Sequence, residues 1–558
     1  MTRKSRLLSW GIYIATLWAV QPLGRPEVAA AGQVEAAQNI QRVGTGITAD
    51  GNIDLGPYSK LAPWPNTDGR YLYSGCYDPA PLVKNIPASD RCFMTVDLKD
   101  PLKPVRLATV NAFDPVHSPP PPAGHIVWSP TYPFANLPVR VPCQVDWNDP
   151  DIAAGKKAPG CWDPGWNTHT TYMAEGPGKL LAVNQERYRG GTNRQANYHG
   201  VKFYDVSNPA HPVFLSYWEA PASPANPVSG ESLDANGAHR FNFKDRNLYL
   251  GTEYKGYVGR ILVILDVRDA RNPKESGKWW LPGQKTPEEN AVRDWVQQPN
   301  FSNPVVKDPT GKWTKQVGMH YVTIQGNSAY LSYNQAGLII LDVRDNRNPK
   351  FVSRVDYLIP GADPTNPDQD ACKKAAGGRD AACGNTHAAK RIPGRNLLLV
   401  TDEYFTCPYG HVRIFDISDE AHPKIISHFL TDQNTACNPD KPNQPADQAR
   451  FPLRGPSSHL GNARESNLYF MAWYGMGVRA MDLTDPHHPV EIGYYEYRID
   501  RDLGVENPAY SGSDTYDVLF GPGGYLYVSD GTAGLRVLKY TGRKGPENSI
   551  SRRRSKMP

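Results

Sequence analysis

The chain has 558 residues and a formal net charge of +5, part of which lies in basic stretches near its two ends. A charge this small for the length argues against a nucleic-acid partner. The 52 prolines and 49 glycines, together with little helical periodicity, argue against a helical fold and are typical of a strand-rich chain with many turns.

The first residues have the features of an export signal. Basic residues precede a largely apolar run from Leu7 to Val20, and small residues follow at 29–31. The run is too short for a spanning helix, so the pattern predicts a signal peptide over residues 1–31. No later stretch reaches about 18 consecutive apolar residues. We therefore expect a periplasmic or secreted protein with no stable membrane span, and an uncleaved anchor is the alternative.

A short pattern recurs through nearly the whole chain. An apolar run ends in Asp, and an apolar residue, a polar turn and a Pro follow, as in LIILDVRDNRNP from Leu338 and VRIFDISDEAHP from Val412. Each copy predicts a strand, a turn and a second strand. The six marker aspartates are Asp97, Asp205, Asp266, Asp342, Asp416 and Asp482.

This pattern resembles the LVIVD-repeat family, which is named for such an apolar core ending in Val-Asp and occurs in secreted and surface-associated bacterial proteins. The resemblance covers most of the chain after the signal peptide. It implies an all-β fold, a β-propeller. It implies little about chemistry, because a fold does not carry a function with it.

Two further strands precede each marked strand, as AHRFNF and LYLGTEY precede LVILD from Leu262. We therefore predict four-stranded antiparallel blades, with strands A to D running outward from the axis. We count seven blades in one domain over residues 32–541, starting near residues 58, 168, 238, 319, 386, 458 and 514. Six or eight blades stay open because the first unit lacks a clear strand A.

The seventh unit lacks a fourth strand, which would leave a bare sheet edge. We expect the segment from Ile40 to Ala49 to supply that strand and to close the ring. Residues 542–558 form a basic tail without apolar pattern, which we expect to be disordered.

The long loops are the D–A and B–C connections, which emerge on one face of a four-stranded meander. Long loops in a compact domain are usually functional, so this face is the expected site. All eight cysteines fall on it, and an even number in an exported chain predicts disulfides. Pairing in sequence order staples the loops, and a metal-thiolate site is the alternative. The predicted pairs are Cys76–Cys92, Cys143–Cys161, Cys372–Cys383 and Cys407–Cys437.

Five histidines recur where strand A begins, at the elaborated mouth of the central channel. Acidic residues recur at the ends of the B strands on the same face. We predict that at least three of the histidines bind a transition metal, copper, iron or zinc, because neutral imidazole suits all three. The acids would fix the imidazole rings or act as acid–base groups beside the metal. The candidate metal ligands are His169, His239, His320, His387 and His459, and the candidate catalytic acids are Glu186, Glu253 and Glu403.

Two alternatives to the metal site stay open. In WD-repeat propellers a His before strand A and an Asp in a turn bond within each blade, and the spacing from His239 to Asp266 looks like that arrangement. A metal-free binding or acid–base pocket is the other alternative. No nucleotide cofactor is expected, since the Walker and Rossmann signatures are absent.

Two classes of function follow from this pattern. The first is a metal-dependent, oxidative enzyme acting on a small organic substrate. The second is a non-catalytic scaffold that binds an extracytoplasmic protein or a glycan with the same loop-rich face.

Overall fold

The structure is a computed structural model. It describes residues 33–43, 70–76, 92–111, 127–130, 142–145, 173–185, 200–221, 238–285, 303–307, 313–355, 385–446, 457–499, 513–530 and 534–542, without 258, 283, 315–316, 335, 405–406, 442–444, 459 and 514. The signal-peptide region, the C-terminal tail, His169, His459 and Glu186 lie outside these residues.

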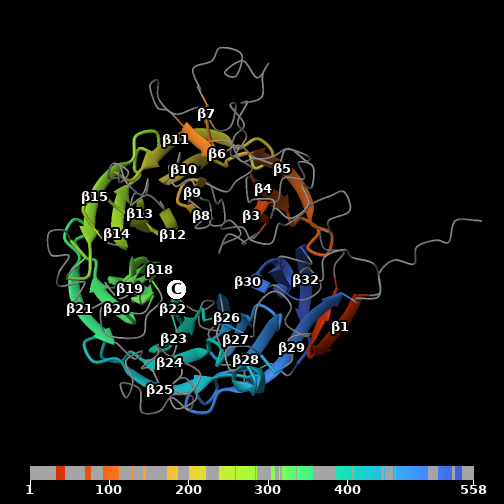
Figure 1. Cartoon of the computed structure of the whole chain (residues 1–558). Coiled ribbons are helices and arrows are strands. Elements are labelled where there is room, and N and C mark those ends of the chain that lie inside the picture. The colour runs from red at the N-terminus through yellow and green to blue at the C-terminus, as the bar shows by residue number, and fades with distance from the viewer. Residues whose placement is uncertain are drawn as a thin grey trace, which may run out of the picture.

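The described part is almost entirely antiparallel β-sheet, arranged as a ring of blades around a central axis (Figure 1). This arrangement is propeller-like, as the repeat pattern predicts. The first three sheets comprise β3 (Tyr71–Cys76), β4 (Cys92–Asp97) and β5 (Val105–Asn111); β8 (Met173–Gly176), β9 (Leu180–Gln185), β10 (Gly200–Asp205) and β11 (Val213–Glu219); and β12 (Ala238–Lys244), β13 (Asn247–Glu253), β14 (Arg260–Asp266) and β15 (Lys274–Trp279).

Two four-stranded units follow and join into one sheet through a single pair between β19 and β22. They comprise β18 (Val317–Gln325), β19 (Ser328–Asn334), β20 (Leu338–Asp342) and β21 (Lys350–Val355); and β22 (Thr386–Arg391), β23 (Leu397–Asp402), β24 (Val412–Asp416) and β25 (Lys424–Phe429).

Each of the last two units gains one strand from the N-terminal part of the chain. They comprise β26 (Gly461–Glu465), β27 (Leu468–Ala472), β28 (Val478–Asp482) and β29 (Val490–Ile499); and β30 (Thr515–Phe520), β31 (Leu526–Asp530) and β32 (Gly534–Tyr540). Short elements outside the main sheets are β6 (Val127–Pro130), β7 (Pro142–Val145), β16 (Asn303–Lys307), β17 (Trp313–Thr314), the helix α4 (Asp432–Thr435) and the 3-10 turn η3 (Pro522–Gly524).

The core lies between neighbouring sheets. In β14 the five residues from Ile261 to Leu265 are all fully buried, although their side chains point alternately to opposite faces. Ile261, Val263 and Leu265 pack in one apolar cluster, and Leu262 and Ile264 pack in the next. A middle strand with two buried faces is therefore largely apolar, which is why the repeat is so visible in the sequence.

The marker aspartates close the turns between the third and fourth strands of each unit. The Asp342 carboxylate accepts a hydrogen bond of 2.9 Å from the backbone N–H of Arg344, and Asp97 accepts one of 2.8 Å from that of Lys99. Such bonds stabilise a turn locally. Hydrogen bonding from Arg344, chiefly from its side chain, lowers the pKa of Asp342 to about 2.

The N-terminal segment adds two strands. β2 (Ile40–Arg42) pairs with β32, where an outer strand was expected from the segment Ile40 to Ala49. β1 (Gln33–Gln38) was not expected, and it pairs with β29 as a fifth strand of the preceding sheet. Asn39 joins them in a left-handed conformation with φ 56°, and its side chain donates a 2.7 Å hydrogen bond to the carbonyl of Ile492.

One of the four predicted disulfides, Cys407–Cys437, is formed within the described residues, with a Cα–Cα distance of 5.6 Å. Cys76 and Cys92 are register partners on β3 and β4. Their side chains, and the Cys143–Cys161 and Cys372–Cys383 pairs, lie outside what the structure describes. Among the described residues, no helix has the length and apolar character needed to span a membrane.

Candidate functional site

The innermost strands carry histidines at irregularities in their pairing. In β12 the register slips between Ala238 and Arg240, so His239 is an extra residue on the inner strand. His387 is the extra residue of β22 in the same way. In β18 the slip is wider, between Val317 and Tyr321, and it includes His320. A bulge redirects a side chain out of the normal alternation, and bulges are frequent beside active sites.

The three histidines meet on the axis side of adjacent units. The Nε2 atoms of His239 and His320 are 2.7 Å apart, so one ring donates a hydrogen bond to the other. The centroids of the His320 and His387 rings are 4.1 Å apart. His320 Nδ1 lies 2.9 Å from the backbone carbonyl of His387, and donation to this carbonyl leaves Nε2 as the acceptor nitrogen.

Glu403 supplies a carboxylate to the same place. Its Oε2 atom is 3.5 Å from His387 Nε2 and 3.8 Å from His320 Nε2. The ligand atoms of these three residues all lie within 4.8 Å of one another. The Tyr474 hydroxyl, from the next unit of the ring, donates a hydrogen bond to Glu403 Oε1. The carboxylate therefore has one oxygen directed at the imidazoles and the other held by a phenol.

The environment of His320 favours the neutral form of its imidazole. Burial, together with the nearby His387, His239, Arg240 and Arg260, holds the pKa of His320 well below its usual range. A neutral imidazole is the form that binds a metal ion. His387 is fully buried and His239 is partly buried, so the rings cluster with little access to solvent.

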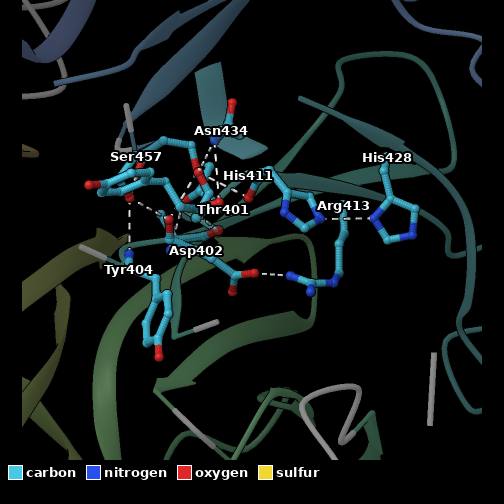
Figure 2. Close-up of polar contacts among 12 residues, drawn as sticks. Thr401, Asp402, Tyr404, His411, Arg413, His428, Asn434 and Ser457 are labelled. Atoms are coloured by element: carbon cyan, nitrogen blue, oxygen red, sulfur yellow. Dashed lines mark hydrogen bonds and ion pairs between the residues drawn. The ribbon is translucent and has the colours of Figure 1, made fainter. Parts of the chain in front are cut away.

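A buried polar network fixes the segment that carries Glu403 (Figure 2). On one side, Arg413 donates to the Asp402 carboxylate, and both side chains are fully buried. On the other side, the Ser457 hydroxyl accepts a 3.0 Å hydrogen bond from the backbone N–H of Tyr404 and donates one of 3.2 Å to the Asp402 carbonyl. Glu403 is thus held between two anchored neighbours.

The same network extends to the disulfide. Asn434, in the short helix α4, donates a 2.9 Å side-chain hydrogen bond to the carbonyl of Gly410, and its backbone carbonyl accepts one of 2.8 Å from the N–H of Tyr409. Cys407 and Cys437 lie on either side of this contact. The loop between β23 and β24 is therefore tied to the loop after β25.

The structure does not bring every predicted residue to this site. Glu253 is buried at the end of β13, where it is the register partner of Arg260, and it is not part of the group of three ligands. Its predicted acid–base role has no support from this placement. His169, His459 and Glu186 lie outside the described residues, so their predicted roles stay predictions.

His320 does not follow the WD-repeat arrangement, in which a histidine forms its hydrogen bonds within its own blade. All its contacts above are with residues of neighbouring units. Asp266 is at the far end of β14 from His239, and its carboxylate accepts from Arg268. His387 does face an acid of its own unit, Glu403, but the same carboxylate oxygen also faces His320.

The residues that sequence reasoning missed include Tyr474 and a set of buried basic residues. Tyr474 was missed because it is not acidic, although it follows its strand B at the repeat position of Glu403. In four units, strand C carries a buried basic residue at the same repeat position. Each of these residues is the register partner of the equivalent residue in its strand B. A search for charged residues inside the apolar runs would have found them. They are Lys202, Arg413, Arg479 and Arg536.

A model of the LVIVD repeat matches residues 320–357. The chain contains an LVIVD repeat. The matched segment begins at His320 and runs through β19 and β20 to just beyond β21. Its first residue is therefore one of the candidate metal ligands. No curated protein matches the sequence.

Several solved structures are weakly similar. A streptogramin B lyase structure is 9% identical, with 90% of this chain and 97% of that chain covered and a TM-score of 0.40. A chain of a mitotic checkpoint complex is 10% identical, with 96% and 98% covered and a TM-score of 0.39. The computationally designed Ika8 protein is 7% identical, with 89% and 99% covered and a TM-score of 0.38. Similarity at this level gives no information on activity.

Proposed function

We propose that this chain is a metal-dependent enzyme whose metal lies at the axis of the propeller, held by His320, His387 and Glu403 with His239 beside them. The observation that carries the proposal is the convergence of two imidazoles and a carboxylate from two adjacent units, with ligand atoms within 4.8 Å of one another. Ligands of one ion lie about 2.0–2.2 Å from it, so small movements of these side chains would complete a site.

The donor set fits a transition metal. Imidazole nitrogen suits zinc, copper and iron, and two histidines with one carboxylate are the ligands of many non-heme iron enzymes that use dioxygen. The Tyr474 hydrogen bond to the second oxygen of Glu403 is the kind of outer contact that orients a metal ligand. We therefore favour iron or copper and an oxidative reaction on a small organic substrate.

The proposal includes the finer features of the fold. We propose seven blades, counted from the seven main units of strands, with β2 closing the last unit against β32. We also propose that the protein is exported to the periplasm or beyond, which the sequence of residues 1–31 and the Cys407–Cys437 disulfide support.

A scaffold that binds a protein or a glycan on the loop-rich face is the alternative function. Such a scaffold needs a continuous apolar or aromatic patch. In the described part of the chain the exposed large apolar side chains are on the outer strands of four different sheets, namely Val105, Val213, Phe351 and Val490. These four side chains lie on separate sheets, whereas two imidazoles and a carboxylate converge at the axis, and we favour the enzyme on that convergence.

Metal analysis of the purified protein tests this proposal. After incubation with iron, copper or zinc and removal of free metal, wild type should retain about one ion per chain. His320→Ala and His387→Ala should lose most of it. His422→Ala is the matched control, because His422 is exposed and bonds only to Asp419 among the contacts described. Wild type without bound metal, or metal retained equally by all the variants, would contradict the proposal.

A further inference from the structure

Four polar residues occupy the same structural position in consecutive units. Each marker aspartate pairs with the first residue of its strand B, and the residue six places further on follows or ends that strand. In chain order these residues are Glu253, Asn334, Glu403 and Tyr474. The repeat therefore places one of these residues at the equivalent end of strand B in each of these four units.

Two members of this set lie at the proposed metal site. The side chains of Glu403 and Tyr474 reach each other across two units, and Glu403 also faces His320 and His387. Asn334 belongs to the unit between those of His239 and His387. Its Cα is the register partner of Val317 in β18 and of Thr386 in β22. Asn334 therefore sits between the two strands that carry the proposed ligands.

The loop at Asn334 is built like the loop at Tyr474. In both, the residue before it donates its N–H to a glycine carbonyl, at 2.9 Å for Tyr333 to Gly337 and 2.7 Å for Trp473 to Gly477. Both residues adopt a left-handed backbone, with φ 47° for Asn334 and 38° for Tyr474. Since these two loops share a conformation, the side chain of Asn334 leaves the backbone in the direction that Tyr474 takes toward the site.

The side-chain amide of Asn334 is buried, and no hydrogen bond within the described residues accounts for it. Asn334 is 1% exposed, and neither its Oδ1 nor its Nδ2 has a hydrogen-bond partner among the residues that the structure describes. A buried polar group without a partner costs stability, and a left-handed backbone at a residue other than glycine adds to the cost. On stability alone, glycine would therefore be the better residue at this position.

We propose that Asn334 binds the organic ligand of the metal site and selects its chemistry, an inference that rests on the proposed function. A carboxamide side chain is satisfied by a ligand that offers a hydrogen-bond acceptor and a donor next to each other. The ligand class is thus a small polar molecule that binds the metal through oxygen and carries an adjacent N–H or O–H group, such as an amide or a hydroxylated compound. A site built around such hydrogen bonds discriminates strongly against analogues that lack the donor.

The probe for this inference is acetohydroxamate, which binds metals through oxygen and carries an N–H, and acetate is the matched probe without the N–H. Each is titrated into cobalt-loaded protein, and binding is followed by visible absorption. Asn334→Gly removes the amide and keeps the left-handed backbone. It should bind acetohydroxamate about tenfold more weakly than wild type, with a smaller loss for acetate, which has no N–H to donate to the amide oxygen.

Asp245→Gly is the control variant. Asp245 also has a left-handed backbone, with φ 54°, but it lies in the tight turn between β12 and β13, at the opposite end of the strands from His239. This variant should bind both probes as wild type does. Thermal unfolding supplies the second readout: Asn334→Gly should unfold at the same temperature as wild type or a higher one, because it removes an unpaired buried amide.

Equal affinity of Asn334→Gly and wild type for acetohydroxamate, in protein that holds cobalt, would overturn the role of Asn334 and leave the metal site standing. A lower unfolding temperature with unchanged probe affinity would assign Asn334 a structural role and would also overturn the inference. Failure of wild type to hold cobalt would instead overturn the proposed function on which the inference rests. If Asn334→Gly does not fold, Asn334→Ala is titrated by the same criteria.

Discussion

Replacing Arg413 by methionine should destabilise the protein by about 3–5 kcal/mol, because it leaves the carboxylate of Asp402 buried without its partner. The estimate follows from geometry: both side chains of the pair are fully buried, and the guanidinium donates directly to Asp402 Oδ2. With a slope of about 3 kcal/mol per molar urea, the unfolding midpoint should fall by about 1–1.7 M.

The double variant Asp402→Asn with Arg413→Met distinguishes the cost of an unpaired buried charge from the cost of losing both side chains. Removing both charges should cost less than the sum of the two single changes, because no uncompensated charge stays buried. Arg268→Met is the control, since Arg268 bonds to Asp266 at 79% exposure and should leave the midpoint nearly unchanged. A midpoint for Arg413→Met that matches this control would refute the reasoning.

Two other predictions test the site and the ring. Tyr474→Phe keeps the ring packing on Tyr516 but removes the hydrogen bond to Glu403, so metal affinity should fall about 10–100-fold with little change in unfolding temperature; affinity equal to that of wild type in a competition assay with a chelator would count against the proposed metal site. Deleting residues 33–43 removes β1 and β2 and leaves β32 as a bare edge, so the unfolding temperature should fall and aggregation should increase; a deletion variant that melts like wild type would show that these strands do not close the ring.

The strands of the middle layers could be predicted because their cause is local. β14 and β20 are short apolar runs that end at a marker aspartate, and the aspartate bonds to the backbone two residues on. Burial of both faces favours apolar residues along most of such a strand. Pattern and structure therefore correspond residue by residue.

The convergence of the histidines could be proposed from their recurrence, but the sequence does not determine it. His239 and His387 are each the one extra residue of a bulge, and a bulge has no sequence signature of its own. A shift of one residue would direct the side chain into the sheet packing instead of toward the axis. Glu253 illustrates this limit, since its spacing is that of Glu403 but it lies in the ladder opposite Arg260.

Asn334 was overlooked for a different reason. Its proposed role rests on the lack of a hydrogen-bond partner among the described residues, which the sequence alone does not show. β1 was overlooked because residues 33–38 carry no apolar alternation strong enough to predict a strand, and their pairing with β29 is a tertiary effect.

The pairing of Ile40 with Tyr540 has a consequence for biosynthesis. Ile40 and Tyr540 are 500 positions apart in the sequence, so this contact must wait until β32 has left the ribosome. Contacts between such distant segments slow folding, and the outer edges of β29 and β32 stay uncovered until they form. The interval between synthesis of β32 and its pairing with β2 is thus a period in which newly made molecules are prone to associate with one another through these edges.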